Sequence, residues 1–457
     1  MKTNLKLTVV LLLPLAILYS SCEKLLEIPP SKNQIESGTV FADSTTVNTA
    51  LLGAYYTLGT VHSSMKFISL YADEYNTTSS ALINLEYANG KLLSNNTNNN
   101  TLWNNLYSVI YQCNNLLEGI ESSTGLSPAA REQFSGEGKF LRAYAYFYLV
   151  NCYDQVPLLL STNVTLNRSA FQATTDAVYL QVVKDLTESS NDLQEGYLGA
   201  GRVRANKTCA HSLLARTYLY RGKWQEAISE SSKVIQNSVY QLTTVKAEDV
   251  FLAGSSEAIL QLWMVNGFLT DVAQLIPASP TTLPIYPLRE EFYSGFETGD
   301  QRKSKWTALA NVNSAGQTRV YAYPAKYKNR VASTAKPEFA MALRLSEQYL
   351  IRAEAKAQLN QISSAVDDLN LIRTRAGLVP LNQNLSQENC LEAIFKERKS
   401  ELFGEWGHRF FDLKRYAKLE GIMAPIKTSW KTGTSEVFPI PNNEIIYNPN
   451  LKQNNGY

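Results

Sequence analysis

Two short helices predicted over residues 205–236 constrain the fold of this chain more than any other stretch. In the first helix, apolar and small side chains recur every three or four residues, which places them on one face. That face carries Ala210, Leu213, Leu214, Thr217 and Tyr218. Gly222 interrupts the pattern, and a second amphipathic helix begins near Trp224. Ala215 and Ala227 lie twelve residues apart, one on each helix, so the two backbones can approach closely. The stretch therefore predicts a helix–turn–helix unit.

The same unit recurs elsewhere in the chain. Residues 347–375 contain Ala353 and Ala365, again twelve residues apart. Segments 50–59 and 141–149 show the same spacing of a small residue followed by Tyr, without an adjacent partner helix. Helical segments at about 102–119 and 176–193 supply partners for these two. Repeated helix pairs of this kind follow the tetratricopeptide pattern, and an array needs about three of them to be stable. We predict a mainly α fold, a tetratricopeptide-like scaffold of about four degenerate helix pairs with an irregular, partly β insertion and long loops.

The first 21 residues are predicted to be a signal peptide. Lys2 and Lys6 precede an apolar run, residues 7–18, which is too short to span a membrane but typical of a secretory signal. Small residues directly before Cys22 indicate a lipoprotein, in which the peptide is cleaved before a lipidated cysteine. The alternative is an ordinary signal peptide followed by an incidental cysteine. We predict lipidation at Cys22.

Charge and motif content exclude several classes of function. The formal charge is +2, and removal of Lys2 and Lys6 brings it to zero. A neutral chain without a basic block argues against nucleic-acid binding. The sequence has no CxxC, HExxH, GxSxG, Walker or GxGxxG motif, so we predict no metal and no cofactor. The remaining cysteines are interpreted as buried free thiols or one chance bridge; they are Cys113, Cys152, Cys209 and Cys390.

The chain of 457 residues exceeds one ordinary hydrophobic core, so we divide it into regions. The predicted regions are residues 1–21 (signal peptide), 22–42 (acylated N-terminus and linker), 43–247 (N-terminal helical repeats), 248–339 (irregular insertion and ligand face), 340–376 (last helix pair) and 377–457 (C-terminal region and tail). Within the N-terminal helical-repeat region, residues 61–100 are expected to be irregular.

Candidate ligand-binding residues come from this irregular stretch and from the insertion, because binding residues usually lie on loops held by a rigid scaffold. Aromatic rings cover the apolar face of a sugar, while amides and carboxylates bind its hydroxyl groups. The residues predicted to do so are Asp73, Tyr75, Asn76, Asn266, Phe268, Tyr286 and Trp306. Trp263, Tyr321 and Tyr323 share this chemistry. The alternative is that these side chains anchor loops or fill the core of the insertion.

Acidic and basic residues alternate near the C-terminus. Glu397, Glu401 and Glu405 are four residues apart on one helical face, with Arg398 beside them. Such spacing favours hydrogen-bonded ion pairs that fix a corner of a fold. A catalytic carboxylate pair, as in glycosidases, is the alternative. Because the pattern neutralises itself, we predict no catalytic residue.

These C-terminal residues also carry a family resemblance. Residues 397–402 and 405–415 resemble the C-terminal signature of the SusD/RagB family of Bacteroidetes outer-membrane lipoproteins. Residues 141–147 resemble the third-helix motif of that family, and residues 438–457 resemble its closing tail. Together with Cys22, the resemblance extends over essentially the whole chain.

The resemblance implies a non-catalytic nutrient-binding lipoprotein of the outer membrane, anchored at Cys22 and facing the cell exterior. Its implied ligand is an oligosaccharide, or a peptide as in some members. Its implied partner is a SusC-like TonB-dependent transporter, to which the ligand is delivered. Two alternatives remain open: a secreted enzyme that acts on glycans, and a periplasmic helical-repeat adaptor.

Overall fold

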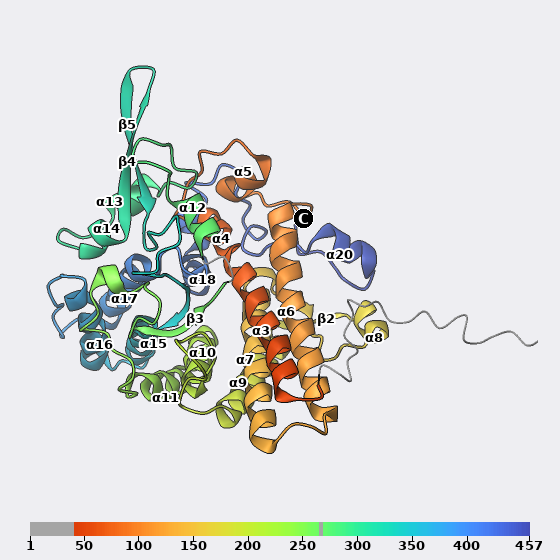
Figure 1. Ribbon diagram of the computed structural model, residues 1–457. Helices are drawn as coiled ribbons and strands as arrows, with labels where there is room; N and C mark the ends of the chain where they lie inside the picture. The colour runs from red at the N-terminus through yellow and green to blue at the C-terminus, as the bar shows by residue number, and fades with distance from the viewer. Residues whose placement is uncertain (1–40, 265–267) are drawn as a thin grey trace, which may run out of the picture.

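Four long helices from the first half of the chain pack side by side in the computed structural model, which describes residues 41–264 and 268–457. They are α3 (Ser44–His62), α6 (Thr97–Ser122), α7 (Pro128–Tyr153) and α9 (Thr175–Asp192). Helix α3 packs on α6, α6 on α7, and α7 on α9 (Figure 1). The two segments that lacked an adjacent partner therefore have the partners that the sequence predicts.

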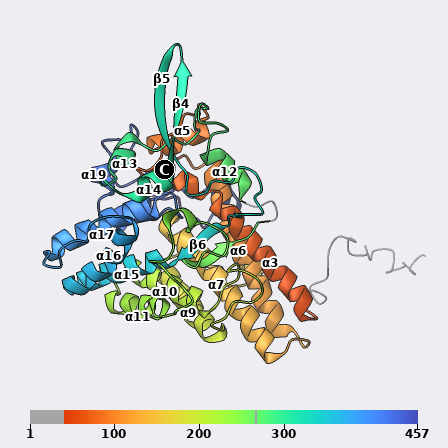
Figure 2. The same cartoon turned by 60° about the vertical axis from the view of Figure 1, so that its left-hand side comes forward.

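The array continues through the second half of the chain. Helix α9 packs on α10 (Lys207–Tyr220), which pairs with α11 (Trp224–Ile235). Helix α11 then packs on α15 (Leu345–Gln358), which pairs with α16 (Ile362–Arg375). Helix α17 (Gln387–Leu402) covers both α15 and α16 (Figure 2). The predicted helical-repeat scaffold of four pairs is confirmed.

Small residues mark the places where the helices come close. Ala215 and Ala227 are fully buried and share one apolar cluster with Ile351 and Ala355 of α15. Gly222 adopts φ 64° in the turn between α10 and α11, a left-handed conformation that glycine tolerates without cost. The two alanines thus lie where helices α10, α11 and α15 meet.

The insertion between α11 and α15 is partly β, as expected. Strand β3 (Ala258–Leu262) pairs antiparallel with β6 (Ala340–Arg344), which brings the two ends of the insertion together. Strands β4 (Thr307–Ser314) and β5 (Gln317–Pro324) form a hairpin that projects from the body in both views (Figures 1 and 2). Its turn residues, Ala315 and Gly316, both have positive φ, which matches the twist of a two-residue hairpin turn.

The stretch 61–100 is more ordered than the sequence suggested. It contains α4 (Met65–Tyr71) and α5 (Leu82–Asn89), and α6 begins inside the asparagine-rich run. The Asn96 side chain accepts hydrogen bonds from the backbone N–H groups of Asn98 and Asn99. Asparagine favours this capping position, so the run starts a helix where the prediction had a loop.

Short elements complete the described chain. They are β1 (Val156–Pro157), α8 (Val164–Arg168), β2 (Gln172–Ala173), η2 (Ala247–Asp249), α12 (Leu269–Leu275), α13 (Glu290–Ser294), α14 (Gln301–Lys305), α18 (His408–Arg415), α19 (Leu419–Met423) and α20 (Asn442–Tyr447). The four cysteines of the described residues are buried and free. Among the helices of residues 41–264 and 268–457, none has the length and apolar character needed to cross a membrane.

A buried ionic network joins the insertion to the helical array. The Glu401 carboxylate accepts hydrogen bonds from Arg302 of α14, from Arg344 at the end of β6 and from Arg375 of α16. Arg344 also binds Glu405 through Nε, at 2.8 Å. Burial alone would raise the pKa of Glu401, but the three arginines hold it well below its usual range. We call these five side chains the Glu401 network. As predicted, the acids and arginines fix a corner of the fold.

Replacing Arg344 by leucine is expected to lower the free energy of unfolding by about 3–5 kcal/mol, because three buried carboxylates, Glu257, Glu401 and Glu405, would lose a charged partner. The measurement is chemical unfolding followed by circular dichroism. Arg168→Leu is the matched control, since Arg168 is exposed on α8 and forms no ion pair within the described chain. A loss below about 1 kcal/mol for Arg344→Leu would contradict this account.

Candidate functional site

An open cavity of about 580 Å³ lies at the root of the β4–β5 hairpin. Its walls come from three places in the chain: the segment after α4, the segment that leads into α13, and the hairpin itself. The lining side chains are Asn76, Thr77, Thr78, Pro287, Leu288, Arg289, Glu290, Glu291, Tyr293, Leu309, Arg319, Val320, Tyr321 and Ala322. We call this space the hairpin cavity. Its volume is within the range of small-molecule sites.

Backbone hydrogen bonds hold the three walls together. The N–H of Asn76 donates to the Pro287 carbonyl at 2.8 Å, and the N–H of Leu288 donates to the Ala322 carbonyl at 2.8 Å. An isolated antiparallel bridge joins Tyr75 to Leu288. The segment after α4 and the hairpin thus flank the same central strand-like segment. The lining side chains are carried on a fixed frame.

The cavity combines aromatic rings with polar groups. The rings of Tyr293 and Tyr321 are half-buried, and the side chain of Asn76 is exposed beside them. A cation lies near each ring: Lys303 Nζ is 4.5 Å from the Tyr293 centroid, and the Arg319 guanidinium carbon is 5.1 Å from that of Tyr321. Rings with amide, hydroxyl and charged neighbours suit a polar ligand that has apolar faces, as a sugar has.

Of the seven residues predicted to bind the ligand, Asn76 lines this cavity, and so does Tyr321, which the sequence analysis named for the same chemistry. Asn266 and the lipidation site Cys22 lie outside the described residues. The other five predicted ligand residues are buried. Their exposed fractions are 8% for Asp73, 2% for Tyr75, 4% for Phe268, 3% for Tyr286 and 0% for Trp306.

The buried candidates have structural partners, which corrects their predicted role. Asp73 accepts two hydrogen bonds from Arg409, at 2.7 and 2.8 Å. The Trp306 indole N–H donates to the Ala247 carbonyl at 2.7 Å, and Phe268 packs edge-on against Tyr327. None of these side chains presents a ring face or a free carboxylate to solvent.

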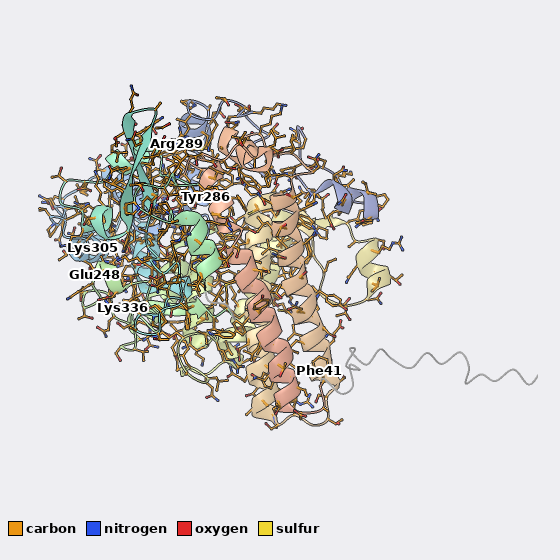
Figure 3. The ribbon with its side chains drawn as sticks, turned by 45° about the horizontal axis from the view of Figure 1, so that its top comes forward. Phe41, Glu248, Tyr286, Arg289, Lys305 and Lys336 are labelled. Carbon is orange, nitrogen blue, oxygen red and sulfur yellow. The ribbon has the colours of Figure 1, made fainter. Side chains whose placement is uncertain are left out.

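Tyr75 and Tyr286 lie just beneath the hairpin cavity. The Tyr75 hydroxyl packs so closely on Gly404 that a Cβ there would lie 2.2 Å from it. Tyr286 packs edge-on against Phe67 and lies near Arg289 on the face that Figure 3 labels. Tyr75 is buried and the next residue, Asn76, is exposed, because successive side chains of an extended segment point to opposite sides.

Sequence reasoning missed Arg289, Tyr293 and Arg319. Period-two alternation in residues 317–324 places Arg319 and Tyr321 on one face of β5, and this pattern was the available signal. Nothing local marks Arg289 or Tyr293, since α13 has only five residues. Their place in the cavity depends on contacts with distant segments.

Two buried titratable groups lie behind the cavity. Burial raises the pKa of Glu74 to about 7, although the N–H of Gly404 donates to its carboxylate at 3.2 Å. Burial, together with the nearby charge of Arg289, lowers the pKa of Lys427 to about 7. The Lys427 ammonium donates to the Leu70 carbonyl at 2.6 Å. The Glu74 carbonyl in turn accepts the Arg289 N–H at 3.0 Å.

The chain is similar to proteins of one family along most of its length. A family model described as "SusD family" matches residues 293–457, and one described as "Starch-binding associating with outer membrane" matches residues 26–219. SusD-like proteins P25 and P38 of Formosa agariphila are 26% and 25% identical to it. The P25 alignment covers 78% of this chain and 79% of the relative, and the P38 alignment covers 99% of each. A solved laminarin-binding SusD-like protein has the same fold, with a TM-score of 0.74, 24% identity, and coverage of 91% of this chain and 100% of that one.

Replacing Trp306 by alanine is expected to lower the free energy of unfolding by about 3–5 kcal/mol, because it removes a fully buried indole. Trp263→Ala, at a side chain that is 51% exposed, is expected to cost less than about 1 kcal/mol. Thermal and chemical unfolding of both variants provides the measurement. A stable Trp306→Ala variant would show that this indole is not part of the core.

Replacing Glu74 by glutamine is expected to raise the free energy of unfolding relative to the wild type, and to do so more at pH 8 than at pH 5. The folded-state pKa of about 7 exceeds the ordinary value of 4.5, so the wild-type protein loses stability as the pH rises between these values. Glutamine removes that loss, which amounts to up to about 3 kcal/mol. The difference in unfolding free energy between variant and wild type, measured from pH 4.5 to 8, tests this. The exposed Glu121→Gln change is the control, and a pH-independent difference for Glu74→Gln would contradict the account.

Proposed function

Because this chain belongs to the SusD-like family, we propose that it is a carbohydrate-binding protein of the outer membrane that captures its ligand in the hairpin cavity. The observation that carries the proposal is the cavity itself. Half-buried rings, amide and hydroxyl groups meet there on a frame of backbone hydrogen bonds. Such a site binds a sugar by covering its C–H face and accepting or donating to its hydroxyl groups.

The similar proteins support the ligand class. One matching model is described as starch-binding, and one similar structure is of a laminarin-binding protein. Starch and laminarin are glucans with different linkages, so the shared property is carbohydrate binding. We therefore carry the class of ligand to this chain and not a particular polymer.

We propose capture without turnover. The acids that line the cavity, Glu290 and Glu291, are both exposed. A glycosidase needs one carboxylic acid kept protonated by its surroundings, usually through burial. The Glu401 network is buried among arginines, away from the cavity lining. This arrangement supports a binding protein in preference to a glycan-active enzyme.

The first described residue lies on the other side of the molecule from the hairpin cavity (Figure 3). Phe41 packs directly on Gly119 of α6, and its carbonyl accepts the Ser123 hydroxyl at 2.6 Å. It lies at the opposite end of the α3–α6–α7 bundle from Arg289 (Figure 3). We propose that a lipid at Cys22 anchors the protein and that the hairpin cavity faces away from the membrane. We propose that the captured carbohydrate then passes to a SusC-like TonB-dependent transporter.

Replacing Tyr321 or Tyr293 by alanine is expected to weaken carbohydrate binding about fivefold per ring, since each stacked ring contributes about 1 kcal/mol. Isothermal titration calorimetry with laminarin and with amylopectin measures this. Tyr447→Ala is the control, because that ring is 70% exposed on α20 and does not line the cavity. Folding should be unchanged in all three variants.

The same experiment separates the alternatives. New reducing ends after incubation with the glycans would identify an enzyme. Binding to a peptide library and to none of the glycans would favour the peptide-binding alternative. Glycan binding that is unchanged in both Tyr321→Ala and Tyr293→Ala would place the site elsewhere on the chain.

A further inference from the structure

We propose that the hairpin cavity selects carbohydrates that carry an anionic group, a carboxylate or a sulfate ester, and that Arg289 and Arg319 bind that group. This inference rests on the proposed function, because it assumes that the cavity holds a carbohydrate. It adds the charge of the ligand and the residues that recognise it. The arginines of this protein differ in how closely they are paired with acids.

Arg289 is enclosed but poorly paired. Its side chain is only 16% exposed, and its one charged neighbour within 4 Å in the described chain is Glu291, at 3.7 Å. The Glu291 side chain is itself 74% exposed. The guanidinium of Arg289 makes no hydrogen bond to any residue that the structure describes. Its donors therefore remain available in the cavity.

Other enclosed arginines of this chain have close partners. Arg409 makes two hydrogen bonds to Asp73, and Arg216 makes two to Glu347, at 2.6 and 2.7 Å. A guanidinium presents its donors in a planar fork that matches two oxygens of one anion. Arg289 has the same fork and is more exposed, at 16% against 1% for Arg216 and 4% for Arg409, and no anion lies within hydrogen-bond distance of it in the described chain.

Arg319 faces the same cavity from the hairpin. It lies on β5, and its guanidinium carbon is 5.1 Å from the centroid of Tyr321. No carboxylate of residues 41–264 or 268–457 lies within 4 Å of it. Stacking on the ring fixes the plane of the guanidinium while leaving its edge donors open. The guanidinium groups of Arg289 and Arg319 thus line the same cavity from two different walls.

The buried groups behind the cavity, Lys427 and Glu74, have opposite charges, and burial brings the pKa of each to about 7, so together they add little net charge. The Lys427 ammonium is buried near Arg289, and the carbonyl of Leu70 is its only hydrogen-bond partner in the described chain. The two acids at the rim, Glu290 and Glu291, are exposed, so water and salt screen them strongly. The more enclosed Arg289 dominates the field inside, which favours an anion there.

A neutral sugar does not meet this demand. Its hydroxyl groups pair with amides and hydroxyls such as those of Asn76 and Thr77. When a neutral ligand covers a guanidinium, the N–H groups lose their hydrogen bonds to water and gain only hydrogen bonds to uncharged hydroxyl groups. A carboxylate or sulfate instead returns short, paired hydrogen bonds with a formal charge. The geometry therefore favours a uronic acid or a sulfated sugar over a neutral one.

The test uses matched pairs of glycans that differ only in charge. Oligogalacturonate is compared with its carboxyl-reduced form, and sulfated carrageenan oligosaccharides are compared with the desulfated form. Calorimetric titration is made with the wild-type chain, Arg289→Gln, Arg319→Gln and the control Arg168→Gln, which removes the same charge from exposed α8. Circular dichroism verifies that each variant is folded. Arg319 is exposed, so its replacement keeps the test valid should Arg289→Gln fail to fold.

The expected result is that one anionic glycan binds at least about tenfold more tightly than its neutral counterpart. Either cavity variant should reduce that preference by about tenfold, and Arg168→Gln should leave it unchanged. Raising the salt concentration should weaken the anionic ligand alone. The pair that shows the preference identifies the anion as a carboxylate or a sulfate.

Four results would overturn the inference. Equal binding of charged and neutral members would remove the basis for selection by charge. An equal loss in Arg168→Gln would indicate nonspecific attraction to the protein surface. Binding of neutral laminarin or amylopectin alone, sensitive to Tyr321→Ala, would overturn the inference and leave the proposed function standing. Absence of binding to every glycan would overturn both.

Discussion

The carboxylate of Glu401 holds together parts of the chain that are far apart in sequence. Its three arginine partners come from α14, from the junction of β6 with α15, and from α16. Arg302 lies just before β4, and Lys326, just after β5, donates to the Glu401 carbonyl at 2.8 Å. Both feet of the hairpin are thereby attached to the same helix, α17. One wall of the hairpin cavity depends on this attachment.

The network also explains the burial of Trp306, one of the residues expected at the ligand. Lys326 Nζ lies 4.6 Å from its ring centroid, and Arg375 lies 5.5 Å from it. An indole between cations shields them from water and offers its electron-rich face to them. A buried ion pair adds little net stability, because removing its charges from water costs free energy. A buried charge that has lost its partner is strongly destabilising. The acids and arginines of the Glu401 network all find partners only when the insertion packs in one position on the helices. A site built from three segments requires such a fixed position.

The spacing of residues along the sequence was sufficient to predict the helical scaffold, but it was not sufficient to predict the residues of the hairpin cavity. Ala215 and Ala227 mark a close helix contact through their own spacing, so the repeats could be predicted residue by residue. Whether Trp306 or Tyr321 faces water depends on which distant segments cover each ring, and no local pattern records that. Asn76 was identified as an amide beside aromatic rings in a loop, and the same reasoning also selected Tyr75, which is buried. Arg289 and Tyr293 enter the cavity only through the bridge between Tyr75 and Leu288.

The charges of the molecule are divided between two tasks. In the Glu401 network, two acids meet three arginines in a buried cluster away from the cavity lining, so a change there alters the fold. In the cavity, Arg289 and Arg319 remain without close partners, although their backbones are held by the same frame. Removing either guanidinium leaves the helical array and the hairpin feet untouched. The residues that choose a ligand can therefore vary independently of those that hold the fold, because the two sets share a backbone and no side-chain partner.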